Sequence, residues 1–202
     1  MKKENLFFAY FILILLLIPF KSFAYSSDPQ EFISEVVIEA KKILVKSNGR
    51  EFRVAKLSEI ALKTVDIKGI GSYTLGKYRK ELSEKELKEY HLLFEKYFLK
   101  SFTSRLTDYS DPKIEVISSK VLNPKYTIVN SILLATDDKP EIKIDWRIYT
   151  KDPQKPLIRD LMIEGLSLAK TQKEEFASII ESNDGDIKML FSKLNEFINK
   201  KD

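Results

Sequence analysis

The sequence predicts an α+β domain in which a four-stranded antiparallel meander sheet carries helices from both ends of the chain around an apolar pocket. Apolar residues recur at helical spacing before about residue 110 and after residue 165, and they alternate with polar residues between those points. Turn-forming Pro, Asn and Asp residues join the predicted strands by short links. No repeat or linker interrupts this order, so helices and sheet are expected to share one domain.

The first 24 residues are expected to be a cleaved signal peptide, and residues 25–202 a single lipid-binding domain. A basic start at Lys2 and Lys3 precedes an uncharged run from Leu6 to Phe20, and Ser22–Ala24 has small residues at both ends, before the expected cut. The run is shorter than the ~20 residues that a spanning helix needs. Lys21 fits cleavage least, so a retained anchor is the alternative.

Charge and composition exclude several functions. The first 24 residues hold three Lys and one Glu, so of 34 basic and 30 acidic residues the remaining chain keeps 31 and 29, a net charge of +2. It lacks the basic footprint of a nucleic-acid binder, so no nucleic-acid partner is expected. With no cysteine and one histidine, neither a disulfide framework nor a transition-metal site is expected. No cofactor is predicted.

Two of the helices expected before the sheet carry a start signal. Asp28–Glu31 combines a cap, a proline at the first helical position and a capping box, and helical spacing then continues until Asn48-Gly49. Arg50 to Thr64 repeats the pattern. Residues 66–76 contain glycines and are expected to form one or two helical turns. The capping box Ser83–Glu86 opens the longest helix, expected to reach about Tyr109.

Period-two patterning predicts the strands. They are expected at Lys113–Val121, Tyr126–Ala135, a third segment from Ile142 to Tyr149, and Leu157–Glu164. The third is the clearest, because apolar residues alternate with polar ones throughout. The apolar set is Ile142, Ile144, Trp146 and Ile148, and the predicted wet face holds Lys143, Asp145, Arg147 and Tyr149. Two helices, separated by residues 183–185, are expected after Gly165.

No catalytic residue is predicted. His91 lies on the apolar stripe of the longest helix and is expected to be packed, and no nucleophile-elbow pattern accompanies it. Gly69 and Gly71 lack the third glycine of a dinucleotide-binding loop. Asp66 and Asp160 remain as acids for the alternative function, a small cone-fold enzyme of the isomerase or dehydratase type that uses a buried Asp. Asp145 is a third such acid, but its strand pattern predicts a solvated position.

Large apolar side chains are abundant. They are compatible with an ordinary filled core, as in a pure adaptor protein, and also with an apolar pocket left between sheet and helices. Both arrangements produce the same periodicities, so composition and spacing alone leave the two open.

Several segments together resemble one family over about residues 29–200. They are Asp160–Leu168, Phe176–Ile180, Leu75–Tyr78, the spacing from Phe94 to Tyr109, and the strand that ends at Trp146–Tyr149. They are similar to the MlaC family of periplasmic phospholipid-binding proteins, also called the Ttg2 toluene-tolerance family. The chain departs from that family's pattern at Thr171–Lys173 and at Arg79-Lys80.

The resemblance implies a periplasmic phospholipid carrier that is not an enzyme. Its implied partners are a phospholipid ligand, an inner-membrane ABC transporter with an MCE-domain subunit, and an outer-membrane lipoprotein–porin complex. Lys173 is the candidate for the lipid headgroup. The acyl chains are expected to contact three surfaces. The sheet wall is formed by Ile142, Ile144, Trp146 and Ile148, and the helix wall by Phe94, Phe98 and Phe102. The rim is formed by Leu75 and Tyr78.

Overall fold

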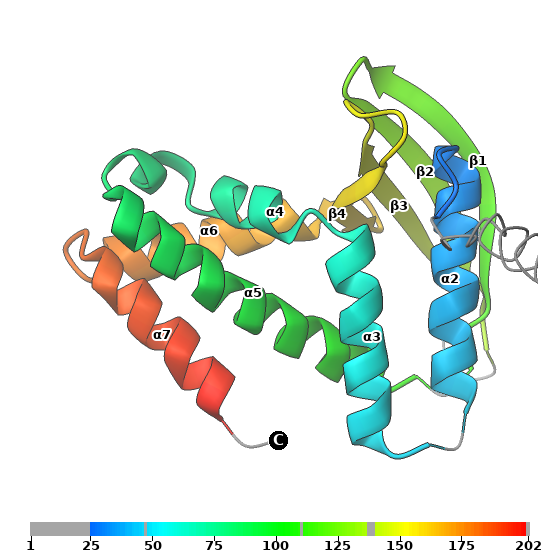
Figure 1. The fold of residues 1–202 in the computed structure, drawn as a ribbon, viewed down its shortest axis with the longest axis horizontal. Coiled ribbons are helices and arrows are strands. Elements are labelled where there is room, and N and C mark those ends of the chain that lie inside the picture. Colours follow the sequence, from blue (N-terminus) through cyan, green and yellow to red (C-terminus); the bar gives the residue numbers. More distant parts are fainter. Residues whose placement is uncertain (1–24, 47, 110, 137–139, 201–202) are drawn as a thin grey trace, which may run out of the picture.

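The computed structural model describes residues 25–46, 48–109, 111–136 and 140–200. The predicted signal peptide and the Asp137-Asp138 turn lie outside them. The α+β class is confirmed (Figure 1). Among the described helices, none combines the length and apolar composition needed to span a bilayer. The elements are α2 (Pro29–Val45), α3 (Arg50–Thr64), α4 (Ile67–Thr74), the 3₁₀-helix η1 (Gly76–Lys80), α5 (Glu84–Leu106), β1 (Ile114–Asn123), β2 (Tyr126–Leu133), β3 (Ile142–Tyr149), β4 (Leu157–Ile163), β5 (Leu166–Ser167), α6 (Leu168–Glu181) and α7 (Ile187–Asn199).

Side-chain caps begin the helices largely where the sequence places them. Asp28 accepts hydrogen bonds from the backbone N–H groups of Gln30 and Glu31, both at 2.9 Å. Glu31 does not complete the predicted capping box, because its carboxylate accepts from Ser26 Oγ at 2.9 Å. The second predicted box is present: Ser83 and Glu86 cap one another at the start of α5. These bonds satisfy some of the backbone donors left without partners at the starts of α2 and α5.

The sheet is a meander of five antiparallel strands in the order β1-β2-β3-β4-β5, one more than predicted. The fifth strand is only two residues long. It forms because Glu164 and Gly165 both adopt positive φ, 50° and 79°, which is the backbone of a tight hairpin turn. The turn folds Leu166-Ser167 back onto β4. A two-residue strand is too short to show an alternating pattern, so the sequence did not predict it.

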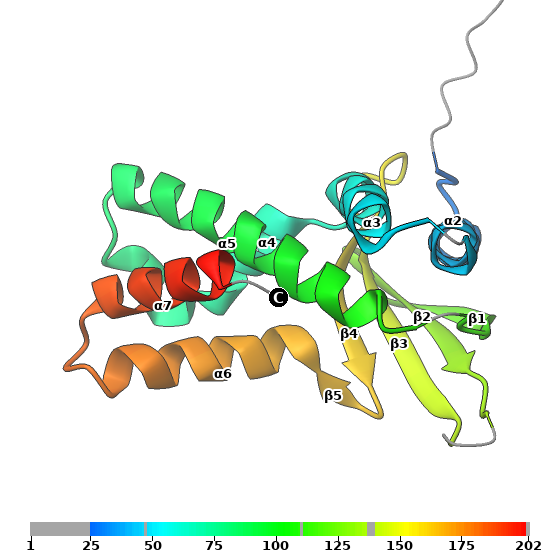
Figure 2. The same ribbon diagram turned by 90° about the horizontal axis from the view of Figure 1, so that it is seen from below.

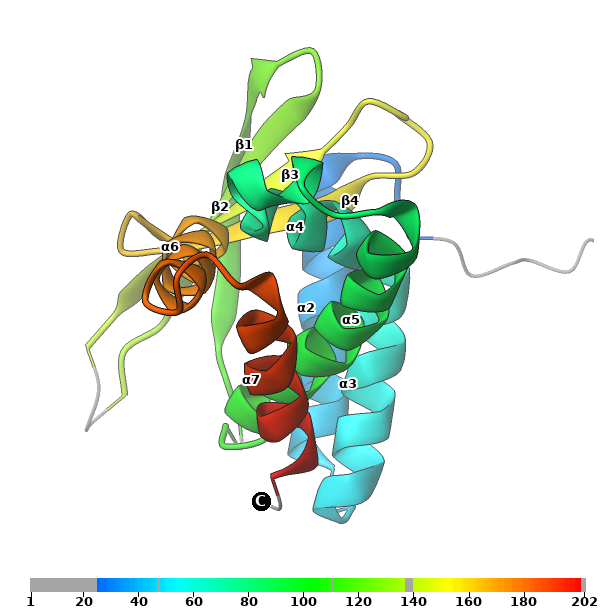
Figure 3. The ribbon, with the colours of Figure 1, turned by 90° about the vertical axis from the view of Figure 1, so that its left-hand side faces the viewer.

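Helices occupy one side of the sheet and the space beyond one of its edges. In Figure 2, α2 and α3 lie above the sheet, whereas α4, α6 and α7 extend past β4 and β5. Figure 3 shows α7 beside α5. The arrangement therefore has a sheet half and a helical half.

Each half has its own buried cluster. The sheet cluster lies between the sheet and helices α2 and α3, and consists of Phe32, Ile33, Val36, Leu44, Leu57, Ile60, Val129, Ile148 and Ile158. The distal cluster lies among the helices beyond the sheet edge, and consists of Ile67, Ile70, Leu75, Tyr78, Tyr90, Phe94, Ala169, Phe176, Ile180, Leu190 and Leu194. The two clusters meet at Val65, which packs against both.

The long helix α5 contributes to both clusters. Tyr90 and Phe94, in its first half, are buried in the distal cluster, whereas Phe102 and Leu106, near its end, pack against the sheet cluster. Residues four apart lie on one face of a helix, so this face of α5 runs from one core to the other. Close packing at the distal end requires Gly71, because a Cβ there would lie 2.8 Å from the Phe94 ring.

Two adjacent residues of β4 hold the helical half to the sheet. Arg159 Nε donates to the Asp66 carboxylate at 2.6 Å, and Asp66 caps α4 through the Gly69 N–H at 2.8 Å. Asp160, only 4% exposed, accepts from Ser167 Oγ at 2.6 Å and from the Ala169 N–H at 3.0 Å, at the start of α6. Both chain connections into the helical half are thus fixed at one point of the sheet edge.

Asp160→Asn should destabilise the protein by about 1.5–3 kcal/mol, because it removes a charge that accepts two hydrogen bonds and faces Arg147 at 3.3 Å. Urea unfolding followed by circular dichroism measures this. Asp108→Asn is the matched control, since Asp108 is exposed and meets Arg50 only at 3.9 Å. Its cost should stay below about 0.5 kcal/mol. Equal costs for both variants would contradict the role given to Asp160.

Stability should fall in acid partly through His91. Its Nε2 lies 2.9 Å from Ser72 Oγ, and burial, followed by the charges of Lys68 and Arg79, lowers its pKa. In the unfolded chain His91 has the ordinary histidine pKa of about 6.5, so the unfolded state binds a proton at His91 more readily than the folded state does. The contribution is present above that value and is lost as pH falls through the folded pKa. Urea unfolding between about pH 7.5 and about pH 5 should show a smaller loss for His91→Gln than for the parent; identical losses would refute this.

Candidate functional site

The structure divides seven of the nine predicted lipid-binding residues between the two clusters, and the other two, Ile142 and Ile144, belong to neither. Leu75, Tyr78 and Phe94 are buried in the distal cluster. Ile148 is fully buried in the sheet cluster, and Trp146 packs against that cluster while half-buried. The nine residues therefore do not form one continuous lining, and their assignment stays a prediction.

Phe98 and Phe102 lie between these two groups. Phe98 packs against the distal cluster and Phe102 against the sheet cluster, and their rings stack at 5.8 Å with 10° between planes. Phe94 continues the row, 6.2 Å from Phe98. We call Phe94, Phe98 and Phe102 the aromatic row. Its last two rings remain half-buried, so large apolar surface stays accessible where the cores meet.

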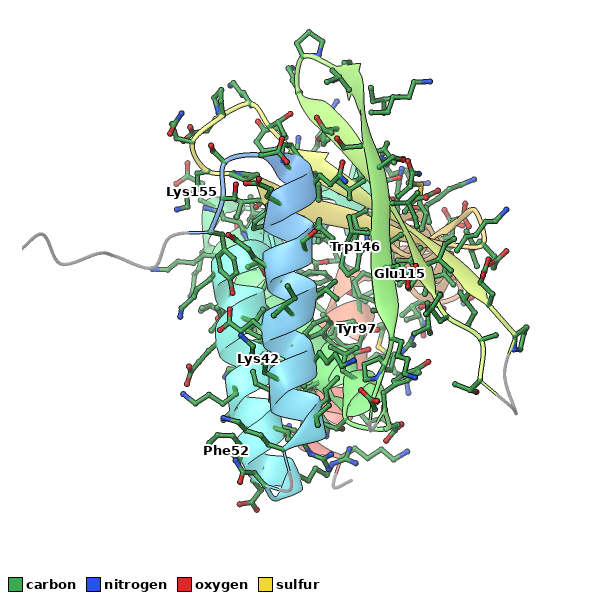
Figure 4. The ribbon with its side chains drawn as sticks, turned by 90° about the vertical axis from the view of Figure 1, so that its right-hand side faces the viewer. Lys42, Phe52, Tyr97, Glu115, Trp146 and Lys155 are labelled. Atoms are coloured by element: carbon green, nitrogen blue, oxygen red, sulfur yellow. The ribbon has the colours of Figure 1, made fainter. Side chains whose placement is uncertain are left out.

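The sheet side of this junction presents a fixed indole. Trp146 Nε1 donates to Ser131 Oγ at 2.9 Å, and Ser131 Oγ donates to the Ile144 carbonyl at 3.0 Å. Ser131 is buried, and these bonds satisfy its polar atom inside the sheet. Figure 4 shows Trp146 behind α2 on the sheet. Ile144 is buried and Ile142 half-buried on the same strand face, which leaves an aliphatic and aromatic surface there.

Polar contacts connect the predicted rim, at η1, to α6. Tyr78 OH donates to Glu181 Oε1 at 3.2 Å, and Lys77 Nζ meets the same oxygen at 3.1 Å. Gly76, at φ +56°, provides the bend between α4 and η1. These contacts fasten η1 to α6, so Leu75 and Tyr78 pack inward rather than facing solvent.

Lys173 lies at the same end of the helical half. Its Nζ is 5.2 Å above the Tyr73 ring, a cation–π contact. A Cβ at Gly76 would approach Lys173 Cε to 2.9 Å, so the lysine stem covers that bend. The structure thus places the predicted headgroup residue over α4 and η1, and not beside the sheet strands.

Two surface hollows were not predicted from the sequence. One, of about 510 Å³, lies on the outer side of α6, and the other, of about 470 Å³, lies between α4 and α5. Neither is lined by any of the nine predicted residues. Their linings are Glu174, Ala177, Ser178, Glu181 and Ser182 for the first, and Ile67, Lys68, Glu84, Leu87, Lys88, His91, Leu92 and Glu95 for the second. His91 is therefore only partly packed, at the floor of a groove between two helices.

The carboxylates of the enzyme alternative serve structural roles. Asp66 is paired with Arg159, whose Nη1 also donates to Tyr126 OH at 3.0 Å. Asp160 is engaged by Ser167, Ala169 and Arg147. Asp145, predicted to be solvated, is half-buried and accepts from Asn130 Nδ2 at 2.7 Å. None of the three lines either hollow, and each has a partner that holds it in place.

Some junction residues escaped prediction. Val65 packs against both clusters, Leu99 packs against the distal cluster, and Leu106 and Val116 pack against the sheet cluster. Val65 also pairs with Ile158 as an isolated parallel bridge, which brings the α3–α4 link onto β4. In the sequence, the only indication of this contact is that an apolar residue directly precedes Asp66.

The polar groups of the described residues leave no arrangement suited to a metal. Within the described ranges, no three His, Asp or Glu side chains are grouped so that they could hold an ion. The candidate that remains is the junction itself, a surface of aromatic and aliphatic groups beside which Trp146 Nε1 and Ser131 Oγ are bonded within the protein. Such a surface suits apolar ligands.

Comparison with known proteins agrees with the fold. The structure is similar to the phospholipid-binding protein from Ralstonia solanacearum, solved in complex with a phospholipid, with a TM-score of 0.70 at 16% identity, covering 84% of this chain and 96% of that chain. No curated protein sequence matches the chain. The family model described as MlaC protein matches residues 34–196. Because that match spans well over half of its length, the chain belongs to the MlaC protein family.

Proposed function

We propose that this chain is a periplasmic phospholipid carrier. It takes lipid between an inner-membrane ABC transporter with an MCE-domain subunit and an outer-membrane lipoprotein–porin complex, and so contributes to outer-membrane lipid asymmetry. The observation that carries the proposal is the MlaC family match over residues 34–196. The structural likeness to a protein solved with a bound phospholipid supports the ligand class.

Acyl chains explain why a carrier is needed. Exposing about thirty methylene groups to water costs on the order of 25 kcal/mol, at ~0.8 kcal/mol each. A protein surface that covers those groups replaces the bilayer, so the transfer itself becomes nearly neutral. Direction must then come from the membrane partners, through ATP hydrolysis by the transporter.

In this proposal the acyl chains bind at the junction of the two clusters. Phe98 and Phe102 form the helix wall, and Trp146 is the central group of the sheet wall, which also includes Ile142, Ile144 and Ile148. The half-buried state of both phenylalanines and of Trp146 supports this, because each has apolar surface left to cover. Phe94, Leu75 and Tyr78 would contact lipid only when the distal cluster opens. Lys173 would meet the headgroup at that end of the helical half.

Export is part of the same proposal. Residues 1–24 would direct the chain across the inner membrane and be removed after Ala24, which releases the domain from the membrane. A chain that retained them would act as a tethered lipid-binding protein and not as a shuttle.

Protein purified gently from a cell envelope should carry phospholipid. Native mass spectrometry should show a second mass envelope displaced by one lipid, and solvent extraction should identify its class. Delipidated protein that is mixed with phospholipid vesicles and separated again should regain the envelope. If neither preparation contains phospholipid in repeated trials, the carrier function is wrong.

Replacing both junction phenylalanines, Phe98→Ala with Phe102→Ala, should weaken lipid retention about tenfold or more, since each half-buried ring contributes ~1 kcal/mol of apolar contact. The bound fraction in native mass spectra of protein with a far-UV spectrum unchanged measures this. Phe52→Ala is the control, because Phe52 is 41% exposed on α3 and should leave retention unchanged. If the parent, the double variant and Phe52→Ala all retain lipid equally while folded, the acyl chains bind elsewhere.

A further inference from the structure

We propose that the mature chain begins at Tyr25 and that its new α-ammonium group is bound by the carboxylates of Glu35 and Glu39 on α2. Removal of residues 1–24 then strengthens the attachment of the amino-terminal segment to the folded domain. The inference rests on the proposed cleavage after Ala24 and is independent of lipid binding.

A row of three carboxylates runs along the exposed side of α2. Glu31, Glu35 and Glu39 are spaced by four residues, so they lie on one face of the helix, and all three are exposed. Like charges at this spacing repel each other by a few tenths of a kcal/mol. A row of this kind is stabilised by any positive charge held against it.

The first two described residues lie directly on this row. The Ser26 N–H donates to Glu35 Oε2 at 2.7 Å, and Ser26 Oγ donates to Glu31 Oε2 at 2.9 Å. Tyr25 OH donates to Glu39. The Tyr25 ring packs edge-on against Phe32, with centroids 5.7 Å apart. Backbone and side chain are thus both anchored, and the segment runs along the helix in a fixed direction.

The surroundings of Tyr25 are negatively charged. Burial, followed by the neighbouring carboxylates Glu39 and Glu35, raises the pKa of the Tyr25 phenol above its ordinary value. Of the charged groups on neighbouring elements, Lys155 lies in the turn before β4 near the start of α2, and Glu115 of β1 lies on the opposite side of α2 (Figure 4). The Tyr25 phenol meets Glu39 and the next backbone nitrogen meets Glu35, so both ends of the residue lie beside carboxylates of this row.

Covalent geometry places that nitrogen close to the row. Consecutive backbone nitrogens are about 3.5 Å apart. Since the Ser26 nitrogen is 2.7 Å from Glu35 Oε2, the Tyr25 nitrogen lies within about 6 Å of the same oxygen. An opposite charge at ~4–6 Å favours the charged form of a group. In the precursor this nitrogen is a neutral amide, whereas after cleavage it is an ammonium group, so the ion pair exists only in the processed chain.

The test uses the chain from Tyr25 to Asp202, reductively methylated with ¹³C so that the α-amine can be titrated by NMR. In the folded protein its pKa should exceed that of the same chain unfolded in urea by about 0.3–0.7. The double variant Glu35→Gln with Glu39→Gln should lose this difference. Glu89→Gln, an exposed change on α5, should keep it. Because the folded pKa is raised, the added stability is present below the unfolded pKa and is lost as pH rises through the folded one.

An α-amine pKa that is the same in the parent and the double variant would overturn the ion pair. The mass of the protein recovered from cells that express the full chain tests the cleavage: a start at Tyr25 supports it, and any other start overturns it. A raised α-amine pKa in a protein that binds no phospholipid would leave this inference standing and refute only the carrier function.

Discussion

The rest of the arrangement depends on the contacts that two adjacent residues of β4, Arg159 and Asp160, make with the helical half. Side chains of adjacent residues point in different directions from a strand, and here each one fixes a different helix start. Arg159 secures α4 through Asp66, and Asp160 secures α6 through the backbone of Ala169. The chain enters the helical half through each of these connections, and between them it returns to the sheet from the end of α5. With both fixed at one edge, the remaining contact between halves is made by α5, whose apolar face joins the two clusters.

This layout leaves an exposed apolar surface at the junction, which is the candidate binding surface. Two cores that share a helix leave large aromatic groups half-covered where they meet, as Phe98, Phe102 and Trp146 are. The polar atoms nearby, such as Ser131 Oγ and Trp146 Nε1, bond to each other and to the sheet. A ligand at the junction therefore meets apolar contact area and few free hydrogen-bonding groups. Such a surface is suited to hydrocarbon chains more than to any particular polar head.

The sequence predicts the helices and strands well, and it predicts less well which residues pack against one another. The period-two alternation gave β3 its observed limits, and the Ser83 cap marked the start of α5, because both signals are local. The strand β5 depends on two residues with positive φ, a property of the backbone that side-chain patterning does not display. The set of residues predicted to bind lipid shows the deeper difficulty. Periodicity indicates that Phe94 and Ile148 are buried, and both are, but it does not indicate that they are buried in different clusters.

The distal cluster also has a consequence for how the chain is made. Its residues come from α4 and α5 before the sheet and from α6 and α7 after it, so more than fifty residues separate its two contributions in the chain. During synthesis, the leading part emerges with its apolar face uncovered and has to wait for the last helices. The distal cluster can reach its final packing only when nearly the whole chain has been made. A topology of this kind postpones completion of the fold until the end of synthesis.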